Sequence, residues 1–250
     1  MQLFYTPDHA RVGDVIPYYE NGEFKLFYLK NWNPYFGSDK TYGWHLLTTK
    51  DLIHYESETA IGILGGTGCI IKVEGLYHLY YCVFEDQPQR QYVCHATSTD
   101  LTNWTKYPDE TFGPDESIYL LTDWRDPHVI WNEEEKCWWM ILCAQNQGNT
   151  KRRGCVGLCK SADLHHWTCC EPLYAPQSSM SAYECPDLFY MNGWWYLVFS
   201  QFTDRFQTLY RMSRSCNGPW IRPKTDSFDG RAFYAAKTCS DGEHRYIFGW

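Results

Sequence analysis

The chain has 250 residues, and 18% of them are aromatic (12 Trp, 20 Tyr and 13 Phe), about twice the share in an ordinary globular protein. So much aromatic surface must be hidden from water, which excludes a disordered chain. The formal net charge is −8 and no Lys/Arg cluster is present, so we expect neither a nucleic-acid partner nor an anionic membrane surface. No apolar run approaches the roughly 18 residues of a membrane span.

The first eight residues show neither the charged nor the apolar region of a secretory signal, so a cytoplasmic location is expected. Several of the 12 cysteines, such as Cys82, Cys143 and Cys185, lie in apolar runs, where a thiol behaves as a small hydrophobe. Cys155 and Cys159 come nearest to a metal-ligand spacing, and the sequence contains no Cys-x-x-Cys pair. We therefore expect reduced core thiols, no metal and no cofactor.

Short runs rich in aromatic and β-branched residues recur along the chain, while helical periodicity is nearly absent. The runs cover 24–29, 77–84, 138–144, 194–200 and 246–250. Turn-forming residues, mostly Asn-Gly or Asp-Gly pairs, precede them. This pattern predicts an antiparallel all-β protein.

A repeat of the form Asp-Leu-x-x-aromatic begins at Asp51, Asp100 and Asp163, each time after a strand end that contains Ser or Thr. A repeat of about 40–50 residues that holds four strands is typical of a β-propeller blade. The predicted blades cover about 13–60, 65–110, 122–176 and 182–225, and a fifth begins near residue 230. The fifth has room for two strands, so residues 1–250 are expected to form one catalytic domain, a five-bladed β-propeller with an incomplete last blade, as in a fragment of a longer protein.

Acidic residues stand where three of these blades begin. The inner strand of a propeller blade presents its first residues to one mouth of the central channel, and Asp14, Asp126 and Glu184 have that placement. The last two lie among aromatic and apolar neighbours just before a proline, where desolvation raises a carboxyl pKa toward the value that a general acid needs. The structural alternative is that Asp126 pairs with Arg125 and that Glu184 binds backbone amides.

Several segments occur together in one order: NP at 33–34, GWH at 43–45, WRDP at 124–127, ECPD at 184–187, FYAAKT at 233–238 and RYIFGW at 245–250. They resemble the motifs of glycoside hydrolase family 32, the β-fructosidases, which include invertases, levanases and inulinases. The resemblance runs over essentially the whole chain. The pair of Arg-Asp-Pro and Glu-Cys-Pro-Asp-Leu-Phe at successive blade starts is its most specific part.

The resemblance implies retaining hydrolysis of β-fructofuranosides, such as sucrose, fructo-oligosaccharides or fructans, through a covalent fructosyl-enzyme intermediate. It assigns Asp14 as the nucleophile, Glu184 as the acid/base and Asp126 as the transition-state stabiliser, with Arg125 beside it. Such chemistry needs two carboxyl groups about 5–5.5 Å apart. The implied partner is a small carbohydrate, and nothing in the sequence sets an oligomeric state.

The chain departs from the family pattern around the nucleophile. Gly13 replaces the Asn that precedes the nucleophile, Leu29 replaces the glutamine of the Phe-Tyr-Gln motif, and the sugar-stacking Trp of the family falls near Asp39. The cleft around the first sugar is therefore expected to differ, and Asp8 is a rival nucleophile. The C-terminal β-sandwich usual in the family is not part of these 250 residues.

Aromatic side chains are the expected sugar platforms, because the C–H faces of a sugar pack on aromatic rings. The candidates are Trp44, Tyr234 and Trp250, each of which can instead belong to the core of so aromatic a propeller. Thr67, between two glycines, is expected to face the channel. We expect the histidines His45, His95 and His128 to be structural.

Two other functions remain open at this point. An inverting arabinofuranosidase or xylosidase of the neighbouring propeller family 43 also uses two Asp and one Glu, although the motif around Cys185 argues against it. A catalytically silent carbohydrate-binding or protein-interaction propeller would explain the altered nucleophile motif.

Overall fold

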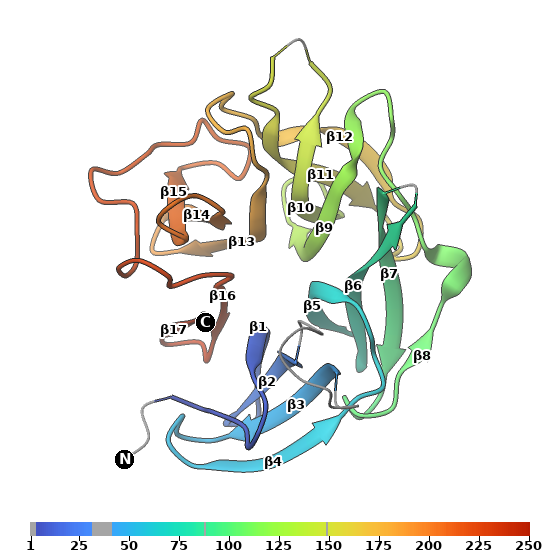
Figure 1. Ribbon diagram of the computed structural model, residues 1–250, viewed down its shortest axis with the longest axis vertical. Coiled ribbons are helices and arrows are strands. Elements are labelled where there is room, and N and C mark those ends of the chain that lie inside the picture. The colour runs from blue at the N-terminus through green and yellow to red at the C-terminus, as the bar shows by residue number, and fades with distance from the viewer. Residues whose placement is uncertain (1–3, 32–41, 88, 149) are drawn as a thin grey trace.

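Five antiparallel sheets surround a central axis in the computed structural model, which describes residues 4–31, 42–87, 89–148 and 150–250 (Figure 1). Their strands follow one another from the centre outward in chain order. The innermost strands form a closed ring, because each contacts the innermost strand of the next sheet and the last contacts the first. The chain therefore folds as a β-propeller, as predicted.

The first three sheets of the described chain have four strands each. The first consists of β1 (Val12–Glu20), β2 (Glu23–Lys30), β3 (Gly43–Thr49) and β4 (Tyr55–Ala60). The second consists of β5 (Gly66–Val73), β6 (Leu76–Asp86), β7 (Gln89–Ser98) and β8 (Thr105–Lys106), followed by the short 3-10 helix η2 (Pro108–Glu110). The third consists of β9 (Tyr119–Asn132), β10 (Cys137–Asn146), β11 (Gly154–Ser161) and β12 (Thr168–Tyr174).

The last two sheets are smaller among the described residues. The fourth has β13 (Tyr183–Met191), β14 (Trp194–Gln201) and β15 (Gln207–Ser213), and the fifth has β16 (Lys237–Ser240) and β17 (Arg245–Phe248). The prediction of a five-bladed propeller whose last blade is incomplete is confirmed. The predicted limits of the first three blades agree with these strands to within a few residues, whereas the fourth was predicted to extend to about residue 225 and its last strand, β15, ends at Ser213. No helix in the described part of the chain is long and apolar enough to cross a bilayer.

The Asp-Leu-x-x-aromatic repeat forms the same turn in each of the first three sheets, between the third and fourth strands. In each turn one carboxylate oxygen of the Asp accepts hydrogen bonds from the two backbone N–H groups two and three residues later. The preceding Thr or Ser hydroxyl accepts the N–H of the Leu, whose φ lies between 61° and 70°. These side-chain bonds satisfy backbone donors that the tight turn removes from the sheet, which explains the composition of the repeat.

Aromatic and aliphatic side chains fill the spaces between neighbouring sheets rather than one central core. Separate clusters lie between the first and second, second and third, third and fourth, and fifth and first sheets. Trp124 and Trp139 are fully buried in two of these layers. Nine of the 12 cysteines are buried as free thiols, which agrees with their position in apolar runs.

Gly68 on β5 lies against the neighbouring strand so closely that a Cβ there would overlap the carbonyl oxygen of Tyr80. We expect Gly68→Ala to lower the free energy of unfolding by about 1–3 kcal/mol or more, because β5 would have to move away from β6. Chemical denaturation measures this change. Gly230→Ala is the matched control, since nothing lies within 4 Å of a Cβ at Gly230. Equal stability of the two variants would contradict the packing described here.

Candidate active site

The innermost strands of the first four sheets are irregular at the same end of the ring. The pairing of β1 with β2 shifts between Val12 and Val15, and that of β5 with β6 shifts between Gly66 and Gly68. On β9 two residues, Asp126 and Pro127, lie opposite one residue of β10, and on β13 Cys185 and Pro186 do the same opposite β14. Such β-bulges redirect side chains and are frequent next to active sites. Here they bring side chains of four sheets to one mouth of the channel.

The bulges on β9 and β13 share an unusual backbone. Asp126 has φ +57° and Cys185 has φ +48°, and each precedes a proline, which disfavours the right-handed helical region. A left-handed conformation of a residue other than glycine costs roughly 1–3 kcal/mol. The backbone N–H of Cys185 donates to Oδ2 of Asp126 at 2.9 Å, so the two bulges hold each other.

The bulges open onto one cavity of about 350 Å³. Seven of the eight site residues predicted from the sequence line it: Asp14, Thr67, Arg125, Asp126, Glu184, Tyr234 and Trp250. Their side chains come from five sheets or the segments next to them. The structure thus brings the three predicted catalytic carboxyl groups together, although their individual roles remain predictions.

Asp14 is held by two hydrogen-bond donors. The hydroxyl of Thr67 donates to Oδ2, and Nε1 of Trp250 donates to Oδ1 at 2.7 Å. Burial and the nearby charge of Asp126 raise the pKa of Asp14 to about 6, against the lowering effect of the two hydrogen bonds. Asp14 is therefore ionised at neutral pH and aimed into the cavity with its orientation fixed.

Glu184 is held on both of its carboxylate oxygens. Nη2 of Arg125 donates to Oε1 at 2.6 Å, and the hydroxyl of Tyr234 donates to Oε2. Arg125 is itself fixed, since its Nη1 donates to Asp123 at 2.6 Å and to Gln91 at 3.2 Å. Burial raises the pKa of Tyr234 far above its ordinary value, and the charge of Glu184 adds to this effect, so the phenol stays protonated and keeps donating.

A buried polar network supports Glu184 from behind. Asp187, which is 1% exposed, accepts the backbone N–H of Thr238 at 2.6 Å and its hydroxyl at 2.8 Å. Lys237, also fully buried, donates to the carbonyl oxygen of Pro186 at 3.0 Å. These bonds join β13 to β16 and fix the bulge that carries Glu184. The last two residues of Glu-Cys-Pro-Asp therefore act in the framework of the site, as does His128, whose Nε2 lies 3.4 Å from Asp187.

An aromatic wall leads from the mouth of the cavity to Asp14. Phe202 contacts Phe206, Phe206 contacts Tyr234 and Tyr234 contacts Trp250, with ring-centroid distances of 4.6, 5.7 and 6.1 Å. Phe202 is 57% exposed, and Phe84, on another part of the rim, is 52% exposed. These phenylalanines were not predicted as site residues from the sequence. The available signal was their position at the ends of strands that share the channel mouth with Asp14 and Glu184.

Trp44 is the exception among the predicted site residues. It is 2% exposed and lies in the hydrophobic cluster between the first and second sheets, together with Ile61 and Ile63. It does not line the cavity, so the prediction of Trp44 as a sugar platform has to be corrected. All seven residues of β3 are buried, and its tryptophan packs in the layer between the first and second sheets.

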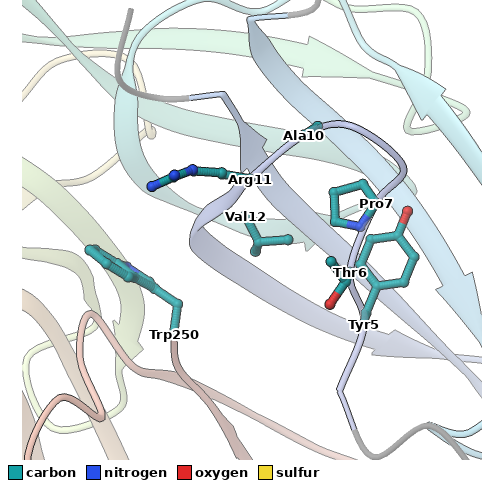
Figure 2. A pocket seen from close by; sticks show the side chains of 7 residues that line it. All are labelled: Tyr5, Thr6, Pro7, Ala10, Arg11, Val12 and Trp250. Atoms are coloured by element: carbon teal, nitrogen blue, oxygen red, sulfur yellow. The ribbon is translucent and has the colours of Figure 1, made fainter. Parts of the chain in front are cut away.

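A second pocket of about 330 Å³ adjoins the other side of Trp250 (Figure 2). There the indole faces the N-terminal segment that carries Arg11 and Val12. Asp8, the rival nucleophile, is exposed on this segment and lines neither pocket. Asp39, near which the family has its sugar-stacking Trp, and the Asn33-Pro34 motif lie outside the described residues.

A family model described as the glycosyl hydrolases family 32 N-terminal domain matches residues 15–250. The chain belongs to glycoside hydrolase family 32. The resemblance found in the motifs is thereby confirmed, and the family 43 alternative is set aside. The match begins one residue after Asp14, so the assignment of Asp14 depends on the geometry of the site.

Individual relatives within family 32 are distant. A levanbiose-producing levanase of Bacillus subtilis (strain 168) is 26% identical over 258 residues, which cover 94% of this chain and 45% of the relative. A sucrose-6-phosphate hydrolase of Escherichia coli is 28% identical over 243 residues, which cover 83% and 48%. The chain thus spans about half the length of these curated relatives. The structure of a family 32 β-fructofuranosidase of Bombyx mori superposes with a TM-score of 0.74 at 24% identity, covering 96% of this chain and 55% of that one.

The environment of Asp14 predicts a pH dependence. A nucleophilic Asp14 must be ionised, so kcat/KM for a fructoside is expected to fall as the pH decreases through about 6. The hydrogen bond from Thr67 stabilises the ionised form. Thr67→Val should therefore raise the pKa of Asp14, so that kcat/KM begins to fall at a higher pH than in the unaltered chain. A pH–rate profile measures this change. Thr59→Val on the exposed face of β4 is the matched control, and an equal shift in both variants would contradict the assignment.

Proposed function

We propose that this family 32 chain hydrolyses β-fructofuranosides with retention of configuration. The observation that carries the proposal is the convergence of Asp14, Asp126 and Glu184 on one cavity, with Asp14 and Glu184 each held by two hydrogen-bond donors. A pair of carboxyl groups that flank the scissile bond is what retaining glycoside hydrolysis needs.

In the first step a carboxylate oxygen of Asp14 attacks the anomeric carbon of the fructosyl unit. Glu184 enters this step in its protonated form and gives that proton to the glycosidic oxygen, and the leaving alcohol departs. A fructosyl ester of Asp14 results. In the second step Glu184 takes a proton from water, whose oxygen attacks the same carbon and releases fructose and the carboxylate of Asp14. Two inversions at one carbon leave the configuration unchanged.

Asp126 supplies negative charge beside the developing oxocarbenium ion. Its position is preorganised, because the backbone N–H of Cys185 and the left-handed conformation of Asp126 itself fix the carboxylate before substrate binds. Arg125, which binds Glu184, completes the polar side of the cavity. We propose that the exposed rings of Phe202 and Phe84 pack against the second sugar at the rim.

The lining of the cavity favours a neutral fructoside. Arg125 is the one Lys or Arg among its described lining residues, and it is already bound to Glu184 and Asp123. Leu29, where the family motif has glutamine, adds an apolar surface opposite the bulge that carries Asp14. Sucrose, fructo-oligosaccharides and levan-type chains are the substrates that this lining fits best.

The experiment is a hydrolysis screen with sucrose, short inulins, levan oligomers and aryl glycosides, with proton NMR of the first sugar released. We expect fructose from at least one β-fructoside, released first as the β anomer. First release of the α anomer would contradict retention. Binding of these sugars in a calorimeter without any turnover would instead identify a carbohydrate-binding propeller and overturn the proposal.

A further inference from the structure

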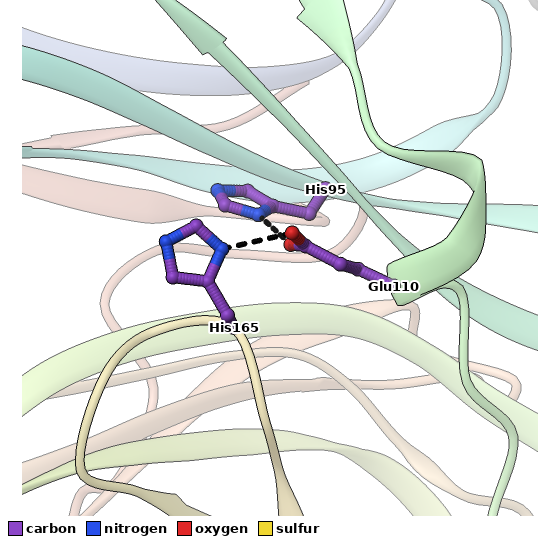
Figure 3. A group of neighbouring side chains, drawn as sticks. All are labelled: His95, Glu110 and His165. Carbon is purple, nitrogen blue, oxygen red and sulfur yellow. Dashed lines mark hydrogen bonds and ion pairs between the residues drawn. The ribbon is translucent and has the colours of Figure 1, made fainter.

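Three side chains capable of binding a metal converge between the second and third sheets (Figure 3). His95 lies on β7 and is 3% exposed, Glu110 ends the short helix η2, and His165 lies in the repeated turn that follows β11. None of the three lines the candidate active site. The proposed hydrolysis does not use them, so the group needs an explanation of its own.

The ligand atoms of this group point at one position. Nδ1 of His95 lies 2.6 Å from Oε2 of Glu110, and Nδ1 of His165 lies 2.9 Å from Oε1 of the same carboxylate. One ligand atom of each of the three residues lies within 4.8 Å of the other two. In a tetrahedral zinc site, with bonds of about 2.0–2.1 Å, neighbouring ligand atoms are about 3.3 Å apart. Each imidazole nitrogen would need to move away from its carboxylate oxygen by less than about 1 Å to admit an ion, and any pair of ligand atoms nearer the 4.8 Å limit would need to approach.

We propose that His95, Glu110 and His165 bind one zinc ion. Two imidazole nitrogens and a carboxylate form a borderline ligand set that suits zinc better than the hard cations magnesium and calcium, which prefer oxygen ligands. The imidazole of His165 is 39% exposed, so water reaches the fourth position. The ion would join the second sheet to a turn of the third.

His78 completes the arrangement from behind. Its Nδ1 lies 3.0 Å from Nε2 of His95, and the two rings are stacked at an interplanar angle of 9°. Once Nδ1 of His95 binds a metal, Nε2 must carry the proton, and this N–H donates a hydrogen bond to Nδ1 of His78. A metal-binding histidine commonly donates its other N–H to such an acceptor, which fixes the ring orientation.

The repeated turns provide an internal comparison. The third residue of Asp-Leu-x-x-aromatic is Ile53 in the first sheet, Thr102 in the second and His165 in the third. The third-sheet turn is the one that faces Glu110, since Nδ1 of His165 lies 2.9 Å from Oε1 of that carboxylate. The next residue, His166, pairs with Asp163 of its own turn at 2.8 Å, as His54 does with Asp51 at 2.7 Å. His166 therefore makes the same contact within its turn as His54 does, whereas His165, at the variable third position, contacts a residue outside its own turn.

The test is calorimetric titration of zinc chloride into the chain after treatment with a chelator. We expect one ion per chain, and His165→Gln should weaken this binding by at least about tenfold, the smallest loss usual for altered metal-site residues. His166→Gln is the matched control and should bind as the unaltered chain does. Absence of stoichiometric binding, or equal binding by the His165→Gln variant, would overturn the proposal.

Cobalt(II) provides a second readout that separates this site from the thiols. Cobalt bound by two histidines and a carboxylate shows d–d absorption without thiolate-to-metal charge transfer. Binding through the partly exposed Cys137, Cys169 or Cys170 would produce the charge-transfer band and contradict the assignment. Because metal that binds the folded chain stabilises it, zinc should also raise the Tm of the unaltered chain and of the His166→Gln variant, and raise that of the His165→Gln variant by less at the same zinc concentration.

Discussion

Glu184→Gln is expected to lower kcat/KM for a natural β-fructoside by about 10²–10⁴-fold, the usual contribution of a general acid or base. The amide keeps the size of Glu184 and can still accept a hydrogen bond from Arg125 or Tyr234, but it has no proton to give to the leaving oxygen. Release of fructose from sucrose or a levan oligomer, measured at saturating and at low substrate, checks the size of the loss.

A substrate that needs no acid separates the two tasks of Glu184. With β-fructofuranosyl fluoride the leaving fluoride departs unaided, so the first step should survive in the Glu184→Gln variant while hydrolysis of the ester, which needs the base, stays slow. Glu133→Gln, on an exposed turn, is the control and should leave the rates of hydrolysis of both substrates unchanged. An undiminished rate on natural fructosides in the Glu184→Gln variant would remove Glu184 from the mechanism.

Asp14→Asn is expected to have a larger effect, a loss of at least about 10⁴-fold in kcat, because an amide cannot form the covalent intermediate and nucleophile losses reach that size in other hydrolases. The new side chain can still accept a hydrogen bond from Thr67 or Trp250, so folding should be retained, as circular dichroism can verify. Asp8→Asn tests the rival assignment. Asp8 is exposed and outside the cavity, so its variant should keep full activity. The reverse pattern would mean that Asp8 is the nucleophile.

The blades were predictable because their signals are local. Each Asp-Leu-x-x-aromatic turn satisfies its own backbone donors with side chains a few residues away, so Asp51, Asp100 and Asp163 marked equivalent places in three sheets. The incomplete fifth sheet followed from a count of the strand runs. The carboxyl groups of the site were found because each stands near the predicted start of a blade, although Asp126 lies at a bulge in the middle of β9 (Tyr119–Asn132) and not at the start of the strand.

Other features depend on packing between sheets, which no local pattern encodes. The place of Phe202 just after a strand run put it near the channel mouth, but no local pattern showed that its ring would line the cavity while Trp44 would face a neighbouring sheet. The bulges are visible only in the pairing of two strands. The group of His95, Glu110 and His165 was missed for the same reason: 70 positions of the chain separate its ends, and His95 by itself was expected to be structural.

The most direct test of the proposed mechanism is to trap the covalent intermediate. In the Glu184→Gln variant, β-fructofuranosyl fluoride should form the fructosyl ester faster than water removes it, so the intermediate accumulates. Intact-mass spectrometry is expected to show the addition of one fructosyl unit per chain, and peptide mapping should place it on Asp14. The absence of an adduct, or an adduct on any other residue, would contradict the assignment of Asp14 as the nucleophile of this site.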